Sequence, residues 1–197
     1  MIVGNPPPRL KVIFVKHSLP QIDPATPANQ WILSAEGARR CLPLAQRLAD
    51  YHPDIVISSD EPKAVETAQR VAEHLALPWQ TGQGLHEHQR QTTPFFPTIE
   101  AFQEGVERFF EQPARLVLGE ETANQAHFRF AKAVDSVLAQ HPHQTMVIVT
   151  HGTVMTLFVS RLFALDPYPF WKRLTLPSFV VLDHSPWRLQ DVVTDIG

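Results

Sequence analysis

Two histidines and two lysines stand where segments of this chain change from apolar to polar. Lys16 and His17 directly follow the apolar run 12–15 in the stretch VIFVKHSLP. His151 follows the apolar run TMVIVT, and Lys63 lies at the start of a helical pattern. A neutral imidazole is nucleophilic near neutral pH, and ammonium groups attract anions. These residue types predict a site that binds an anion such as phosphate, with an imidazole placed to attack it.

Strands that alternate with helices must bring these side chains together. Apolar runs predict strands at about 10–16, 55–58, 78–81 and 145–150. Helical spacing of apolar residues predicts helices over about 34–48, 60–75, 99–110, 122–140 and 152–165. Residues 82–97 are predicted to be loop, and 179–184 and 188–194 to form a closing hairpin or two edge strands.

This alternation predicts an α/β fold, a three-layer α/β/α sandwich with a mainly parallel central sheet. Such sheets bind ligands beyond the carboxyl ends of their strands. We therefore expect His17, His151, Lys16 and Lys63 to converge on one edge. Helix amino termini at that edge would add partial positive charge and free N–H groups for a phosphate.

Composition limits the remaining possibilities. The 197 residues, 44% of them hydrophobic, fit one domain spanning 1–197. A net charge of −3 argues against nucleic acid or an anionic membrane as the main partner. The single cysteine, Cys41, and the lack of a leader or membrane-spanning pattern favour a cytoplasmic protein. No nucleotide-binding glycine loop is present, so no cofactor is expected, and the oligomeric state stays open.

Five motifs in order resemble the histidine phosphatase superfamily, branch 1, also called phosphoglycerate mutase-like. KHS at 16–18 stands where that family has Arg-His-Gly, and VTHG at 149–152 matches without change. The intervening motifs are LSAEGARRC at 33–41, SSDEPKAVETA at 58–68 and LHE at 85–87. The resemblance covers most of the chain and implies a phosphoglycerate mutase-like fold.

The resemblance also implies roles for individual residues. His17 would be the nucleophile that forms a phosphohistidine, and Lys16 and Lys63 would bind phosphate where the family has arginines. His151 would bind a phosphoryl oxygen and stabilise charge in the transition state. Glu87 would protonate the leaving group and then activate water, and a bound phosphate dianion is expected to raise its pKa.

Several of these positions depart from the family pattern or have a simpler interpretation. Lysine cannot make the two-pronged contact of a guanidinium with phosphate. Lys63 in a first helical turn is electrostatically unfavourable unless an anion pairs with it. Ser18 replaces a glycine, and its hydroxyl would either contact phosphate or crowd it. A single histidine at a strand end usually has a structural role, and His88 is the next candidate for the acid after Glu87.

Residues 82–125 are predicted to be a substrate-selecting insertion or lid. Within this segment Arg90, Phe95 and Phe96 are candidate substrate contacts. The sequence GEET at 119–122 is interpreted only as the start of a helix. The alternating histidines of HEH and HPH are interpreted as surface residues, and no metal site is predicted.

We therefore expect a metal-independent phosphomonoester hydrolase that acts through phosphohistidine. Its partner would be a small phosphorylated metabolite or a phosphoprotein. One alternative is a catalytically weak or inactive member that binds phosphorylated ligands without turnover. A second is a mutase-type phosphotransferase, although the GxWEG segment of phosphoglycerate mutases is missing.

Overall fold

The computed structural model of this chain describes residues 10–196. Its strands are β1 (Lys11–Lys16), β2 (Ile55–Ser58), β3 (Trp79–Thr81), β4 (Met146–Thr150), β5 (Ser178–Asp183) and β6 (Arg188–Val193). Its helices are η1 (Ala28–Gln30, 3-10), α1 (Ala35–Ala49), α2 (Pro62–Leu75), α3 (Ile99–Glu111), α4 (Ala123–Gln140), α5 (Gly152–Phe163) and α6 (Pro167–Arg173).

The strands form one six-stranded sheet in the order β3-β2-β4-β1-β5-β6. The pairs β2–β3, β2–β4 and β1–β4 are parallel, whereas β5 pairs antiparallel with β1 and with β6. Residues 178–193 therefore make the antiparallel hairpin at one edge of the sheet. The predicted α/β architecture with a mainly parallel sheet is confirmed.

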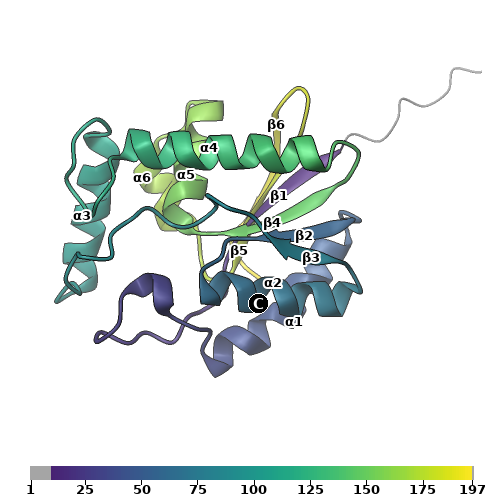
Figure 1. Ribbon diagram of the computed structural model, residues 1–197, viewed down its shortest axis with the longest axis horizontal. Coiled ribbons are helices and arrows are strands. Elements are labelled where there is room, and N and C mark those ends of the chain that lie inside the picture. The colour runs from purple at the N-terminus through teal and green to yellow at the C-terminus, as the bar shows by residue number, and fades with distance from the viewer. Residues whose placement is uncertain (1–9, 197) are drawn as a thin grey trace, which may run out of the picture.

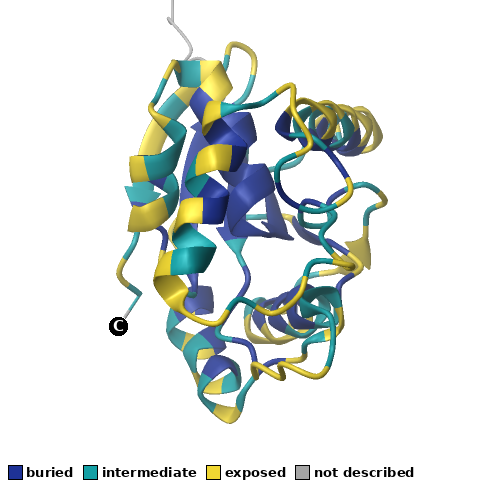
Figure 2. Ribbon diagram, turned by 90° about the vertical axis from the view of Figure 1, so that its left-hand side faces the viewer, coloured by how far each residue is buried: buried dark blue, intermediate teal, exposed yellow. Residues whose placement is uncertain are grey.

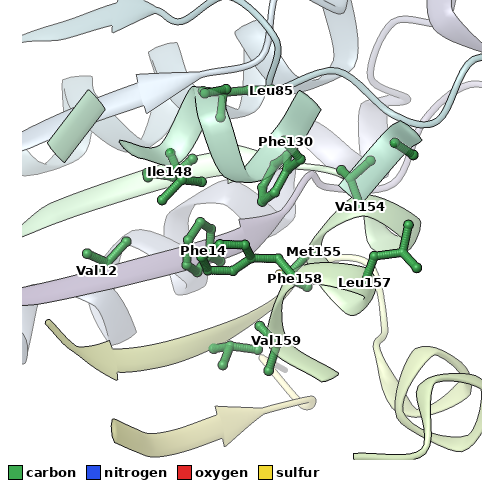
Figure 3. Close-up of a cluster of buried hydrophobic side chains, with 14 of the residues drawn as sticks. Val12, Phe14, Leu85, Phe130, Ile148, Val154, Met155, Leu157, Phe158 and Val159 are labelled. Atoms are coloured by element: carbon green, nitrogen blue, oxygen red, sulfur yellow. The ribbon is translucent and has the colours of Figure 1, made fainter. Parts of the chain in front are cut away.

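Helices cover both faces of the sheet, as Figure 1 shows. Helices α1 and α2 pack on one face, where the buried cluster includes Ile13, Val15 and Leu44. Helices α4 and α5 cover the other face, and Phe14 of β1 lies there against Phe158 at 5.3 Å between ring centroids (Figure 3). In Figure 2 the strands at the centre are buried while the outer sides of the helices are exposed. The apolar strand runs thus form the middle of a three-layer core.

Local sequence explains where the helices begin. The Ser34 hydroxyl accepts a hydrogen bond from the Gly37 N–H at the start of α1, and Thr122 forms a capping box at the start of α4. Pro62 occupies the first turn of α2. One helix, α6, was not predicted, because its seven residues are too few to show a helical period. Ile99, the first residue of α3, is 65% exposed.

No helix within residues 10–196 is long and apolar enough to cross a bilayer. The expectation that no leader begins the chain concerns mainly residues 1–9, which lie outside the described residues.

Candidate active site

A cavity of about 980 Å³ opens beyond the carboxyl ends of β1, β2 and β4. Because β4 lies between β1 and β2, the residues that follow these three strands meet at its floor. The cavity is lined by Lys16, His17, Lys63, Glu87 and His151. The structure therefore brings together the five residues expected to handle a phosphoryl group.

His17 is held in one orientation and one tautomer. Its backbone N–H donates to the Thr150 carbonyl at 3.0 Å, continuing the β1–β4 ladder. Its Nδ1 lies 2.7 Å from the Ser18 carbonyl oxygen, which only accepts hydrogen bonds. Nδ1 therefore carries the proton, and Nε2 keeps its lone pair. Burial, followed by the charges of His151 and Lys63, lowers the pKa of His17 well below its ordinary value, so the ring is neutral near pH 7.

His151 lies beside the His17 ring. The two imidazole centroids are 5.1 Å apart with the rings edge to face. Nε2 of His151 lies 2.8 Å from the Ser59 hydroxyl, while Nδ1 is buried and has no hydrogen-bond partner among residues 10–196. Burial and the Lys63 charge lower the pKa of His151 well below its ordinary value. A buried, unpartnered ring nitrogen is costly unless a ligand pairs with it.

Lys16 reaches the cavity over a glycine. A Cβ at Gly152 would lie 3.1 Å from Cε of Lys16, so glycine in the VTHG motif leaves room for the lysine stem. The ammonium group donates to the Leu174 carbonyl at 2.7 Å, which leaves two of its three N–H groups for a ligand. Burial lowers the pKa of Lys16 to about 8, although the carboxylate of Glu87 opposes the shift.

Lys63 is paired with an anion that the sequence analysis did not single out. Its ammonium group lies 2.5 Å from Oε2 of Glu61 and donates to the Ala28 carbonyl at 2.6 Å. Both side chains of the ion pair are nearly inaccessible to solvent. The anion expected to compensate Lys63 in the first turn of α2 is thus supplied by the chain itself. The sequence did contain a signal for this ion pair, because Glu61 lies two positions before Lys63.

Glu87 occupies the helix terminus that was expected to bind phosphate. Its carboxylate accepts hydrogen bonds from the Thr153 and Val154 N–H groups of α5, at 3.1 and 3.2 Å, and from the His88 N–H at 2.9 Å. Burial alone would raise the pKa of Glu87, but His151, His88 and the hydrogen bonds outweigh burial and lower it. These N–H groups are therefore committed to Glu87, and phosphate must be held mainly by side chains.

Ser18 has a structural environment. Its hydroxyl donates to the Gly37 carbonyl at 2.7 Å, and its N–H donates to the Thr67 hydroxyl at 3.0 Å. These contacts join the end of β1 to α1 and α2. The structure does not bring the Ser18 hydroxyl to the cavity, whose lining residues do not include it.

The expected substrate contacts lie on the outer wall of the cavity, which includes Arg90, Phe95 and Phe96. The Arg90 guanidinium lies 5.0 Å from the centroid of the Phe102 ring and forms no ion pair within residues 10–196. Phe95 is 53% exposed and lies 6.3 Å from the Trp31 ring. The wall thus combines an unpaired cation with accessible aromatic surface.

His88, the second candidate for the acid, also lines the cavity. Its ring is buried against Phe109 at 4.5 Å between centroids, and neither ring nitrogen has a hydrogen-bond partner in the described part of the chain. Burial lowers its pKa to about 4, so His88 is neutral at pH 7 and carries no proton to donate as an imidazolium.

A half-buried arginine supports the loop that carries Glu87. Arg129 of α4 donates to the carbonyls of Gly84, His86 and Glu87 at 2.8–3.1 Å, and lies 2.5 Å from the Glu121 carboxylate. Glu121 also accepts from the Gln89 N–H at 2.9 Å. The interpretation of GEET as only a helix start was therefore incomplete. Local sequence gave no signal for this network, because its partners are far apart along the chain.

Comparisons with known proteins agree with this geometry. The family model for the histidine phosphatase superfamily (branch 1) matches residues 26–193. The chain is 25% identical to phosphoserine phosphatase 1 of Hydrogenobacter thermophilus over 169 residues, which is 82% of this chain and 80% of that protein.

Two solved structures show the same fold. One is a mycobacterial glucosyl-3-phosphoglycerate phosphatase, with a TM-score of 0.74 and 20% identity, over 95% of this chain and 99% of that one. The other is a phosphoserine phosphatase of Entamoeba histolytica, solved as a mutant with phosphoserine, with a TM-score of 0.70 and 17% identity, over 94% and 97% of the chains. Because the family model spans most of the sequence, the chain belongs to the histidine phosphatase superfamily, branch 1, and is a phosphatase of that superfamily.

Proposed function

We propose that this protein is a metal-independent phosphomonoester hydrolase that acts through a phosphohistidine. The observation that carries the proposal is a neutral His17 whose Nε2 is unprotonated, 5.1 Å from the His151 ring in a cavity bordered by two lysines. These side chains supply the positive charge that a phosphoryl group needs. Lys16 and the remaining N–H of Lys63 would bind its oxygens.

In the first step Nε2 of His17 attacks phosphorus while the bond from phosphorus to the ester oxygen breaks. The negative charge of the bound phosphoryl group opposes the lowering of the Glu87 pKa in the free protein, so Glu87 takes up a proton from solvent and gives it to the departing oxygen. His151 can donate its Nδ1–H to a phosphoryl oxygen if the Ser59 hydroxyl donates to Nε2, which their 2.8 Å separation permits. In the second step Glu87 takes a proton from water, the hydroxide attacks phosphorus, and His17 leaves.

The substrate is a small phosphorylated metabolite or a phosphoprotein. Relatives are named for phosphoserine and glucosyl-3-phosphoglycerate, both of which carry a carboxylate besides the phosphate. The unpaired Arg90 guanidinium would meet such a second anionic group, and Phe95 and Phe96 would contact the organic part. On this proposal, the segment 82–125 selects the substrate.

Hydrolysis of an aryl phosphate in the presence of EDTA tests this proposal. The native protein is expected to turn over, and His17→Ala to lose about 10³-fold or more in kcat, because no other group replaces the nucleophile. Loss of the native activity in EDTA would contradict metal independence. Transfer of the phosphoryl group to a second hydroxyl, without release of inorganic phosphate, would indicate a mutase instead.

One observation favours a phosphate-binding protein without turnover as the second candidate. Lys63 is engaged by Glu61, and lysines replace both family arginines, so catalytic power is expected to be reduced. Phosphate-dependent thermal stabilisation with no hydrolysis above the His17→Ala background would support that candidate.

A further inference from the structure

Glu61 contacts three of the residues proposed to take part in catalysis, although the sequence analysis gave it no role. The residue is only 7% exposed. Its Oε2 pairs with the Lys63 ammonium at 2.5 Å, and its Oε1 accepts the Glu87 backbone N–H at 2.9 Å. The same Oε1 lies 3.6 Å from Nε2 of His151. One buried carboxylate therefore lies against a phosphate-binding lysine, the loop of the acid and the second histidine.

The contacts of Glu61 have two effects, and the first is to position Lys63 and the loop that carries Glu87. Lysine has three N–H donors, and Lys63 uses one on Glu61 and one on the Ala28 carbonyl. These two acceptors fix the direction of the third donor. The hydrogen bond from the Glu87 N–H likewise fixes where the loop of the acid passes the end of α2.

The second effect is that the negative charge of Glu61 weakens the binding of an anionic ligand. A carboxylate beside the cavity neutralises Lys63 and repels a phosphate dianion, and in a partly buried site such repulsion is weakly screened. With Lys16 and Lys63 balanced by Glu61 and Glu87, these four charges sum to zero. The cavity therefore favours release of inorganic phosphate more than a site with two unpaired cations.

We propose that Glu61 is a positioning residue that holds Lys63 and the Glu87 loop in place and whose negative charge limits the affinity for the phosphoryl group. The proposal rests on the phosphate site of the proposed function, but not on turnover. On this proposal, the ion pair weakens the binding of phosphate and thereby speeds the release of the product.

Calorimetric titration of the full chain with inorganic phosphate tests the proposal. The variant Glu61→Gln removes the charge and keeps the shape, and is expected to lower the Kd for phosphate about tenfold. With an aryl phosphate as substrate, KM should fall while kcat does not rise. The reason is that an amide has one oxygen, so the side chain of this variant can no longer accept from both Lys63 and the Glu87 N–H.

Glu66→Gln is the matched control, because it removes the same charge from α2, just after the N-cap residue Glu61, at a position outside the cavity lining. Among residues 10–196, its carboxylate accepts only the Leu33 N–H, at 3.2 Å. Phosphate affinity should be unchanged within about twofold in this variant. An equal gain in both variants would show a general charge effect and would overturn the role of Glu61.

A second variant, Glu61→Leu, keeps the test valid if Glu61→Gln does not fold. It also removes the charge, and its apolar side chain suits a buried position. Any weaker or unchanged phosphate binding in the folded variant overturns the proposal, because removal of a charge that limits the affinity for phosphate should tighten binding. Tighter binding in a protein without hydrolysis would uphold this inference and refute the hydrolase. Absence of phosphate binding in both native and variant protein would refute both.

Discussion

Lys16 is expected to limit activity in alkaline solution. Its pKa is lowered to about 8, mainly by burial, against 10.5 for an unperturbed lysine. With a pKa of about 8, roughly one-tenth of the free protein keeps a charged Lys16 at pH 9. Because kcat/KM reports the ionisation of the free enzyme, we expect kcat/KM for an aryl phosphate to fall about tenfold from pH 7 to pH 9.

The variant Lys16→Arg isolates this group. A guanidinium stays charged throughout this range, so the alkaline fall in kcat/KM should disappear, whatever the absolute rate of the variant. The assay is the pH profile of kcat/KM between pH 7 and 10, with Lys132→Arg as control, since Lys132 lies on the exposed side of α4. The reasoning is refuted if Lys16→Arg retains the native alkaline limb, or if the native protein shows none.

Three further results are expected. Gly37→Ala should cost about 1–3 kcal/mol in urea unfolding, because its Cβ would lie 2.0 Å from a backbone carbonyl oxygen, whereas Gly105→Ala, with its nearest contact at 3.4 Å, should be tolerated. Arg129→Ala should lower the free energy of unfolding by about 1–3 kcal/mol, because three carbonyls lose their donor. It should also lower kcat, because the Glu87 loop loses its support, and an unchanged kcat would contradict that support. The pKa of His88 is lowered from 6.5 to about 4 in the folded protein, so His88 binds a proton more readily in the unfolded chain. This residue alone should therefore remove about 3 kcal/mol of the free energy of unfolding as pH falls from 6.5 to 4. The effect should be absent from His88→Asn when both proteins are unfolded in urea across this pH range.

Local signals explain which features the sequence predicted. Strands β1 and β4 contain the apolar runs VIFV and MVIV, and Ser34 marks the start of α1 by its capping hydroxyl, so these elements follow from short-range pattern. Once the strands are parallel, His17 and His151 must share an edge. The approach of their rings was therefore predictable.

Features that depend on distant partners were not predictable. Glu61 gains its importance from a backbone N–H 26 positions later, and Arg129 from carbonyls more than 40 positions earlier. The partner of the Ser18 hydroxyl is also distant along the chain, because this hydroxyl donates to the Gly37 carbonyl of α1. Side-chain partners of this kind depend on packing between elements rather than on periodicity.

The hydrogen bond from the His17 amide to Thr150 makes the proposed nucleophile part of the central β-ladder. Its amide hydrogen should therefore exchange with solvent only through openings that disrupt the middle of the sheet. The imidazole is consequently anchored to the central sheet. On the proposed function, the motions that admit an ester or release product fall to the surrounding walls, so substrate entry and chemical attack belong to separate parts of the chain.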